Sequence, residues 1–533
     1  MKKHISIAGL MSLLLSFSVC AYDAEISFGV SSDPVSLDIH EALSEDIVQF
    51  SHLVFDPLIR RNQKLQYVPR LAQKWQRIDP LTVRFNLRPQ VRFHSGNLLT
   101  SRDVKWTLAR LKRSDDYKGL FERVDQIKVI DDLTFDLITK TPTPLVNQIA
   151  SYLFVLDSAF YTGVDENGFD KSRIEKQGDT FAATHVSGTG PYQVALREKG
   201  MQLRLVRYQD YWDHESLGNI TKLTLIPIKE PATRLAALLS GDVDMISPVA
   251  PKEYISLLDQ PRFTALTWPG TRLISLQLNQ SQNTALKDRR VRQAIIYAIN
   301  NQGIAEQLMQ GFGTAASQQS PPGYIGHNPY LSVRYDLAKA RQLMKQAGYE
   351  KGLNLAMIAP QGRYINDIKV AQAVVAMLQK INIKVTLKTY PINEYWPEFD
   401  RCNADILMIG WRSDTRDSAN YSEYLTMTRN VETGRGQYNC GHYSNPKVDE
   451  YVVKANREID PMPRGQLLRE VELMLYEDAA FVPLHWERLG WAAKKNIRLK
   501  DVVNPDNTPY LGDLQVDEFE NPPSLPLLRS RRQ

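Results

Sequence analysis

The chain has 533 residues, of which 43% are hydrophobic and 23% are charged, and its formal net charge is +5 at pH 7. A chain of this length exceeds what one hydrophobic core usually supports, so we expect two or more lobes. Its basic residues are interspersed with acidic ones, except for a cluster of Arg529, Arg531 and Arg532 that reads as a solvated end. The excess of positive charge is small and is not clustered, which argues against a nucleic acid as partner.

The first 21 residues have the pattern of a secretory signal peptide. Two lysines precede an apolar run over residues 5–19, and cleavage is expected after Ala21, so that the mature chain starts at Tyr22. A lipid anchor on Cys20 is the alternative, but it would require a small residue such as glycine or alanine where Val19 stands. No later stretch has the roughly 18 apolar residues of a membrane span, so the prediction is a periplasmic protein without one.

Strand and helix patterns alternate along the rest of the chain, which predicts an α/β fold. The first clear helix signal is a capping box at Thr100 and Asp103, which opens an amphipathic pattern that runs to Leu111. No repeat or long Gly/Ser linker separates independent domains, so the lobes are expected to be interwoven. Other clear elements, in chain order, are strands over residues 82–88 and 203–207 and helices over residues 291–300, 336–347 and 370–381.

Two cysteines, Cys402 and Cys440, remain in the predicted mature chain. The periplasm is an oxidising compartment, so we expect a disulfide between them. Two buried thiols are the alternative, because a spacing along the sequence does not show proximity. A bridge would stiffen the segment between them, residues 405–439.

The chain lacks the usual catalytic patterns. It contains no Gly-x-Ser-x-Gly, His-Glu-x-x-His or Cys-x-x-Cys motif and no phosphate-binding loop that ends in Gly-Lys-Ser/Thr. Gly311-Phe-Gly313 begins a dinucleotide-binding pattern, but no helix start follows it. The histidines are dispersed, so neither a cofactor nor a metal site is predicted, although a site assembled from distant His or Met residues stays open.

Several segments together resemble the family 5 extracellular solute-binding proteins, which include the dipeptide-, oligopeptide- and nickel-binding proteins of bacterial ABC importers. The clearest block is Phe85-Asn-Leu-Arg-Pro-Gln-Val-Arg-Phe-His-Ser-Gly96, although His94-Ser95 stands where an aspartate often precedes the glycine. Each further block is weak alone, but the ordered set is specific and covers nearly all of the mature chain. These blocks are Gly188-Thr-Gly-Pro-Tyr192, Tyr211-Trp212, Leu239-Ser-Gly-Asp-Val-Asp-Met245, Asp288-Arg-Arg-Val-Arg-Gln-Ala294, Tyr297-Ala-Ile299, Tyr335-Asp336, Ala347-Gly-Tyr349, Tyr443-Ser-Asn-Pro446 and Pro483-Leu484.

The resemblance implies a type II periplasmic-binding-protein fold, with two α/β lobes, a hinge of two chain crossings and a subdomain inserted into lobe I. A ligand between the lobes would favour the closed form that a permease recognises. The implied division is a signal peptide at 1–21, lobe I at 22–56, 184–272 and 496–533, the inserted subdomain at 57–183, and lobe II at 273–495.

The resemblance also implies a ligand site around Asp414. In peptide-binding relatives, an aspartate shortly after a Gly-Trp pair meets the ammonium group of the ligand, and Gly410-Trp411 precedes Asp414 here. A carboxylate–ammonium pair is strong in a dry cleft. The alternative is that Asp414 caps a turn or pairs with Arg412 or Arg416. These arginines depart from the family pattern and would favour a ligand with negative charge besides an ammonium.

Four further residues are expected at the same site. Arg363, before the predicted helix at 370–381, suits the ligand carboxylate, because a guanidinium binds it through two hydrogen bonds. A solvated loop arginine is the alternative. Tyr364 and Trp411 would flank the pocket with aromatic faces, unless Trp411 belongs to the core, and Ser32 would contribute from the first mature strand.

The sequence therefore predicts a monomeric, non-enzymatic binding protein whose partners are a short peptide and an inner-membrane ABC permease. The first alternative keeps the fold and changes the ligand to a metal chelate, haem, an oligosaccharide or an opine-like compound, because fold does not determine the ligand. The second alternative is a periplasmic hydrolase.

Overall fold

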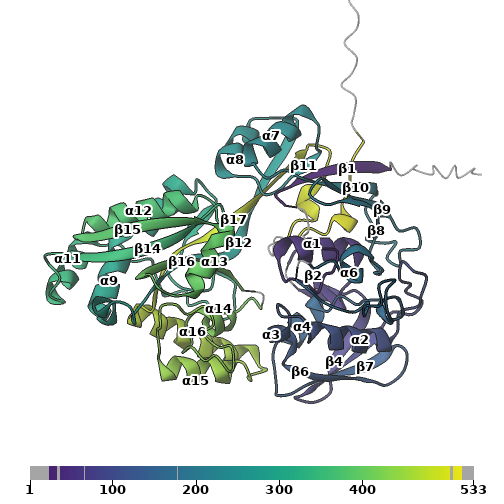
Figure 1. Cartoon of the computed structure of the whole chain (residues 1–533), viewed down its shortest axis with the longest axis horizontal. Coiled ribbons are helices and arrows are strands. Elements are labelled where there is room, and N and C mark those ends of the chain that lie inside the picture. The colour runs from purple at the N-terminus through teal and green to yellow at the C-terminus, as the bar shows by residue number, and fades with distance from the viewer. Residues whose placement is uncertain are drawn as a thin grey trace, which may run out of the picture.

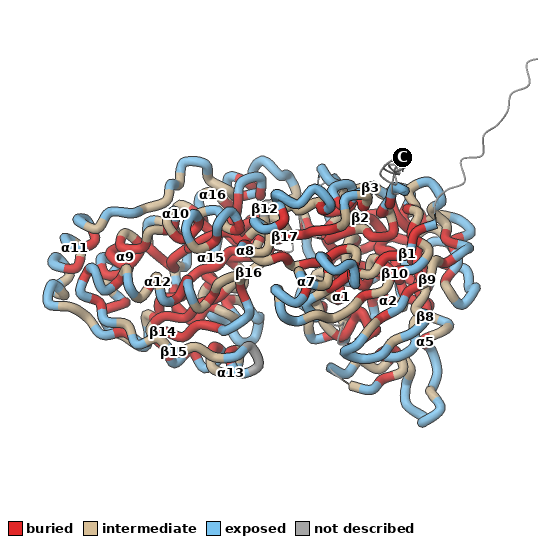
Figure 2. The backbone as a smooth tube through the Cα atoms, turned by 90° about the horizontal axis from the view of Figure 1, so that it is seen from above, coloured by how far each residue is buried: buried red, intermediate tan, exposed pale blue. Residues whose placement is uncertain are grey.

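The computed structural model describes residues 23–32, 36–64, 66–176, 178–413, 415–504 and 508–518. The predicted signal peptide, Asp414 and the arginine-rich C-terminal end lie outside the described residues. Figure 1 shows two bodies of chain side by side, and Figure 2, seen from above, shows them joined near the middle, with buried segments inside each.

One large sheet runs through both lobes, with eleven strands within the described residues. In sheet order its strands are β15 (Ile383–Pro391), β14 (Leu353–Gln361), β16 (Ile406–Arg412), β12 (Phe263–Leu278), β17 (Phe481–Lys494), β11 (Met245–Ile246), β1 (Ala24–Val30), β10 (Ile220–Pro227), β9 (Gln202–Arg207) and β8 (Tyr192–Glu198), with β13 (Gly313–Ala315) paired to β17. In Figure 1, β12 and β17 cross from one body to the other.

The crossing of β12 and β17 has a break in its register. One half of β12 pairs with residues 488–494 of β17 and the other half with residues 481–486, and the regular pairing is interrupted between Pro269 and Leu273. Gly270 lies in this interruption, where a Cβ atom would stand 1.7 Å from the carbonyl oxygen of Glu487. Only glycine fits such a close backbone approach, so position 270 at the junction of the lobes requires a glycine.

Lobe II has helices on both faces of its sheet. The strand β16 shows this directly, because Ile406 and Met408 enter one hydrophobic core while Leu407 and Ile409 enter another. Successive side chains of a strand point to opposite faces, so a strand buried on both faces is continuously apolar. The helices are α9 (Arg289–Ala298), α10 (Asn301–Gly303), α11 (Leu337–Gln346), α12 (Asp367–Gln379), α13 (Ile392–Asp400), α14 (Ser418–Leu425), α15 (Pro446–Ala455) and α16 (Pro461–Asp478).

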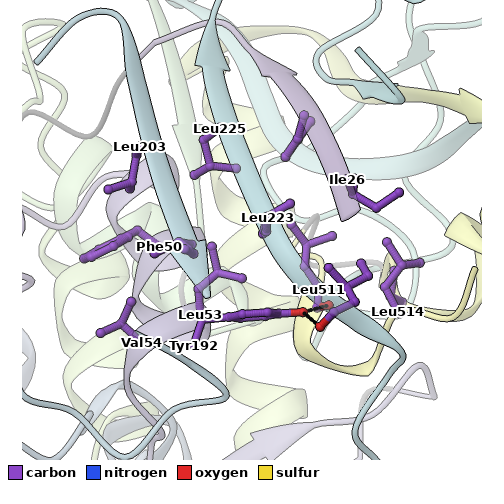
Figure 3. Close-up of a cluster of buried hydrophobic side chains, with 14 of the residues drawn as sticks. Ile26, Phe50, Leu53, Val54, Tyr192, Leu203, Leu223, Leu225, Leu511 and Leu514 are labelled. Carbon is purple, nitrogen blue, oxygen red and sulfur yellow. Dashed lines mark hydrogen bonds between the residues drawn. The ribbon is translucent and has the colours of Figure 1, made fainter. Parts of the chain in front are cut away.

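The core of lobe I contains both ends of the described chain. Figure 3 shows Ile26 near the N-terminus packed close to Leu511 and Leu514 from the C-terminal segment. The hydroxyl of Tyr192 donates to the carbonyl oxygens of Ile220 (3.4 Å) and Leu511 (3.5 Å), which ties this segment to the sheet. The helices of this lobe are α1 (Glu45–Val54), α6 (Phe181–Thr184), α7 (Pro231–Ser240) and α8 (Pro251–Leu258).

A smaller unit with its own sheet and core lies between α1 and α6 in the chain. Its helix α2 begins with the predicted capping box. The Asp103 carboxylate accepts the backbone N–H of Thr100 at 2.8 Å, and the Thr100 hydroxyl oxygen accepts the backbone N–H of Arg102 at 3.3 Å. The elements are β2 (Ile59–Arg61) paired with β3 (Tyr67–Pro69), the sheet β4 (Ala72–Arg77), β5 (Thr82–Leu87), β7 (Thr134–Thr139) and β6 (Val124–Val129), and the helices α2 (Ser101–Leu111), α3 (Lys118–Phe121), α4 (Val146–Tyr152) and α5 (Ser158–Tyr161).

The other predicted elements are confirmed to within a few residues. The strands at 82–88 and 203–207 are β5 and β9, and the helices at 291–300, 336–347 and 370–381 are α9, α11 and α12. A disulfide joins Cys402 to Cys440, with 5.1 Å between the Cα atoms. In the part of the chain that the structure describes, no helix is long and apolar enough to cross a membrane.

Candidate ligand-binding site between the lobes

A pocket of about 40 Å³ lies between the two lobes, beside the interruption in β12. One wall comes from α1, β2, α4 and the C-terminal segment, and the other from β12 and the end of β16. The lining residues on the first wall are Val48, His52, Arg60, Arg61, Gln148, Ser151, Tyr152, Thr508 and Tyr510, and those on the second are Thr271, Arg412 and Ser413.

The C-terminal segment holds Arg60 in place on the first wall. The Arg60 guanidinium forms an ion pair with Asp513 and lies over the ring of Tyr510, 4.4 Å from its centroid. The edge of His52 meets the same ring at 4.9 Å. Burial and the charges of Arg60 and Arg70 hold the pKa of His52 well below its usual value, so the imidazole is neutral and the positive charge of this wall belongs to its arginines.

Arg61 is fixed by neutral oxygen atoms. Its guanidinium donates to the hydroxyl of Tyr67 at 2.7 Å and to the side-chain oxygen of Gln148. The Tyr67 hydroxyl donates in turn to the same Gln148 oxygen at 2.8 Å. This small network holds a buried guanidinium at the pocket, with its fork fixed in direction.

The opposite wall is built on the pair of strands β12 and β16. Arg412 stands directly opposite Arg272 in their register, so both side chains lie on one face of the sheet. Arg272 forms an ion pair with the buried Glu487 at 3.1 Å, and Glu487 also accepts the backbone N–H of Ile365 at 2.9 Å. Glu487 therefore links the crossing strand β17 to the loop before α12.

The segment that follows β16 is anchored below the pocket. Ser413 is buried, and its hydroxyl donates to the carbonyl oxygen of Asp417 at 3.1 Å. Asp417 caps α14 and forms a buried ion pair with Arg464 at 2.5 Å. Ser413 and Asp417 are therefore both held by hydrogen bonds, whereas Asp414 lies outside the described residues.

Trp411 and Arg412, which are neighbours in β16, differ in their position relative to the pocket. Arg412 lines the pocket, whereas Trp411 is absent from the lining. The Trp411 indole N–H donates to the side-chain oxygen of Asn420 at 2.9 Å, and its ring packs on Tyr424 and Tyr438 at 4.8 and 5.2 Å. Its place in the site stays a prediction.

Arg363, Tyr364 and Ser32 also lie outside the pocket lining. Arg363 is exposed, and its backbone N–H donates to Asp367 at 2.8 Å. Tyr364 is 6% exposed and its hydroxyl accepts the backbone N–H of Gly410 at 2.8 Å, so it supports β16 from beneath. Ser32 is exposed just after β1. Their binding roles stay predictions.

Most of the lining was missed by sequence reasoning. The Arg60-Arg61 doublet was visible in the sequence, but no spacing rule relates it to Gln148 or Tyr510, which are far away along the chain. Within the described residues, no group of three or more His, Cys, Asp or Glu side chains could hold a metal ion. The polar groups that line the pocket are guanidinium, hydroxyl, amide and imidazole groups, which can donate or accept hydrogen bonds.

A pocket walled by both lobes at a two-strand crossing is the arrangement of a two-lobed binding protein, whose ligand contacts both lobes at once. The family model of bacterial extracellular solute-binding proteins, family 5 (middle region), matches residues 66–432. The chain therefore belongs to this family, as the ordered sequence blocks predicted.

Individual relatives agree with this assignment. The chain is similar to the glutathione-binding protein GsiB of Pectobacterium atrosepticum, with 25% identity over 515 residues that cover 93% of this chain and 95% of the relative. It also resembles the solved structure of the periplasmic binding protein DppA from Helicobacter pylori in complex with the peptide STSA (22% identity, 93% and 98% coverage, TM-score 0.78).

A third relative carries a different kind of ligand. The solved structure of AgaA from A. tumefaciens R10, in complex with agropinic acid, has 21% identity, covers 93% of this chain and 99% of its own, and has a TM-score of 0.75. The two solved structures confirm the predicted type II periplasmic-binding-protein fold. All three relatives are named as binding proteins.

Proposed function

We propose that this chain is the exported solute-binding component of an ABC importer, which captures a short peptide between its lobes and delivers it to an inner-membrane permease. Residues 1–21 would direct export and be removed. Lobe I would comprise 22–56, 184–272 and 496–533, with the subdomain 57–183 inserted, and lobe II would comprise 273–495.

The observation that carries this proposal is the pocket whose walls come from both sides of the β12–β17 crossing. A ligand bound there contacts Arg61 on one wall and Arg412 on the other. Such a ligand stabilises the closed arrangement of the lobes relative to an open one, because only the closed arrangement offers both walls. Closure would then be the signal that the permease reads.

A peptide is the ligand class that the relatives favour, since GsiB is named for glutathione and DppA was solved with a tetrapeptide. Asp414 would meet the ammonium group, because it adjoins the pocket-lining Ser413. Arg363 would meet a carboxylate only if it moved toward the cleft, and Trp411 and Tyr364 would support the wall. Arg412 would bind the ligand directly.

The test is to identify and then perturb the bound ligand. Native mass spectrometry of freshly purified protein should show a co-purifying peptide, and adding that peptide should raise the melting temperature by mass action. The substitution Asp414→Ala should abolish this rise while leaving the unliganded melting temperature unchanged.

The matched control is Asp259→Ala, at an exposed aspartate at the end of α8, which should keep the full rise. An unchanged rise in Asp414→Ala would remove Asp414 from the site. A co-purifying non-peptide compound, or turnover of the added peptide, would overturn the proposed function itself.

A further inference from the structure

Gln148 carries a buried hydrogen-bond donor that has no partner. The residue is 2% exposed and lines the pocket between the lobes. In the part of the chain that the structure describes, its side-chain nitrogen Nε2 makes no hydrogen bond. Such groups are rare in folded proteins, because a buried donor without an acceptor has lost its bonds to water and gained none in exchange. An acceptor supplied by a ligand would remove this cost.

The orientation of the Gln148 amide is fixed by its neighbours. Its oxygen Oε1 accepts hydrogen bonds from the Arg61 guanidinium and, at 2.8 Å, from the Tyr67 hydroxyl. A guanidinium can only donate, so the amide atom that faces it must be the oxygen. The nitrogen is on the other branch of the amide and keeps its two N–H donors. The amide cannot turn over without placing these donors against the guanidinium.

Helix α4 presents Gln148 to the pocket together with two other residues. Ser151 and Tyr152 also line the pocket, and they follow Gln148 by three and four positions, so all three lie on one face of the helix. The opposite wall includes Ser413 of the proposed lobe II. Closing the lobes takes water away from the space between these walls, and a donor deprived of water needs another acceptor.

We infer that Gln148 is a specificity-determining residue of the site, and that its amide N–H donates to a carbonyl or carboxylate oxygen of the ligand when the lobes close. The inference rests on the proposed peptide-binding function and deepens it. A peptide has such an oxygen at every residue, and the one that meets Gln148 sets the position of the peptide in the cleft. A peptide that lacks this acceptor is rejected, because closure would leave the donor unpaired.

The test exchanges the acceptor oxygens of a peptide one at a time. The probe is the tightest binder from a panel of synthetic tri- and tetrapeptides, with affinities measured by isothermal titration calorimetry. Each amide oxygen is replaced in turn by sulfur, a weaker acceptor, and a descarboxy analogue carries hydrogen in place of the C-terminal carboxylate. In the wild-type protein at least one exchange should weaken binding about tenfold or more. Its position shows whether the acceptor is an amide carbonyl or the carboxylate.

The variant Gln148→Glu removes the donor and keeps the rest of the network. One carboxylate oxygen still accepts from Arg61 and Tyr67, and the other takes the place of the NH₂ group. This variant should bind the parent peptide about tenfold more weakly than the wild type. It should also lose the penalty at one exchanged position while the penalties at the other positions persist, which a double-mutant cycle measures.

The matched control is Gln126→Glu, which adds the same charge at an exposed position on β6, outside the described pocket lining. It should keep the parent affinity and the whole pattern of penalties. Melting temperatures of the unliganded proteins show whether each variant is folded. The exchange series on the wild-type protein needs no variant, so it tests the inference even if Gln148→Glu does not fold.

The outcomes separate this inference from the proposed function. If no exchange weakens wild-type binding by more than about twofold, or if folded Gln148→Glu keeps every penalty, the role of Gln148 is wrong and peptide binding stands. If no peptide of the panel binds to the folded wild-type protein, the proposed function fails, and the inference that rests on it fails as well.

Discussion

The ion pair between Arg123 and Glu423 should stabilise the closed arrangement of the lobes. Arg123 follows α3 in the inserted subdomain, Glu423 belongs to α14 in lobe II, and one guanidinium nitrogen donates to both carboxylate oxygens at 2.7 and 2.8 Å. The contact joins the inserted subdomain to lobe II away from the β12–β17 crossing, so it can exist only when the lobes are together. We predict that Glu423→Gln weakens ligand binding without destabilising either lobe.

The size of the effect follows from how exposed the pair is. The side chains of Arg123 and Glu423 are 24% and 23% exposed. An exposed ion pair contributes about 0.2–1 kcal/mol, whereas removing one partner of a fully buried pair costs about 3–5 kcal/mol. For a partly buried and partly screened pair we take about 1.5 kcal/mol, which corresponds to about a tenfold change in an equilibrium constant.

The assay is the affinity and dissociation rate of the co-purifying peptide, measured by calorimetry and by stopped-flow tryptophan fluorescence. Closing precedes tight binding or accompanies it, so a tenfold loss in the closed population lowers the apparent affinity by the same factor. Most of the change should appear as faster dissociation, and it should shrink at 1 M salt, where the pair is screened. The melting temperature of the unliganded protein should stay within about 1 °C, since neither lobe loses a core contact.

A matched control and a double mutant test the reasoning. Glu398→Gln breaks an ion pair with Arg401 at the end of α13, inside lobe II, and should leave the affinity unchanged. Arg123→Gln should weaken binding as Glu423→Gln does, and the double variant should be no weaker than either. The idea is refuted if both single variants bind the peptide with the wild-type affinity and dissociation rate.

Two further predictions concern stability. Burial raises the pKa of the Glu472 carboxyl from its ordinary 4.5 to about 7, so its contribution is present below pH 4.5 and is lost as the pH rises through 7. By linkage this loss is about 3 kcal/mol, and Glu472→Gln should flatten the fall in unfolding free energy between pH 5 and pH 8 in urea titrations; an unchanged slope would contradict the assignment. The disulfide between Cys402 and Cys440 closes a sequence separation of 38 residues, which is worth about 4 kcal/mol in the chain-entropy model. Cys402→Ser with Cys440→Ser should therefore lower the melting temperature in calorimetry by several degrees, and an equal melting temperature with and without the bridge would show that the reduced chain is already constrained there.

Local signals in the sequence were sufficient to predict several of the strands and helices. The capping box at Thr100 and Asp103 and the aspartate at position 336 each mark a helix start that the structure contains, because a cap involves residues only three positions apart. The family block Gly188-Thr-Gly-Pro-Tyr192 has a reason that local signals do not show. A Cβ at Gly188 or Gly190 would lie 2.0–2.4 Å from backbone atoms of Val54, which is far away along the chain.

The candidate site shows where local reasoning ends. Arg412 was named from the resemblance and lines the pocket. Tyr364 was also expected at the pocket; it lies outside the described lining and its hydroxyl accepts the backbone N–H of Gly410 in β16, so its binding role stays a prediction. Arg60 and Arg61 were overlooked, because an arginine doublet on a short strand has the same local pattern whether it meets solvent or a ligand.

The α/β character, the order of the family blocks and the family membership depend on short patterns and their succession along the chain, so they could be predicted from the sequence. The side chains that form the pocket could be assigned only once the folded arrangement of the chain was known. Its walls join residues 48–61, 148–152, 271, 412–413 and 508–510. Contacts between such distant segments depend on the course of the chain through strands β12 and β17, which connect the lobes. No periodicity or spacing in the sequence predicts these long-range contacts.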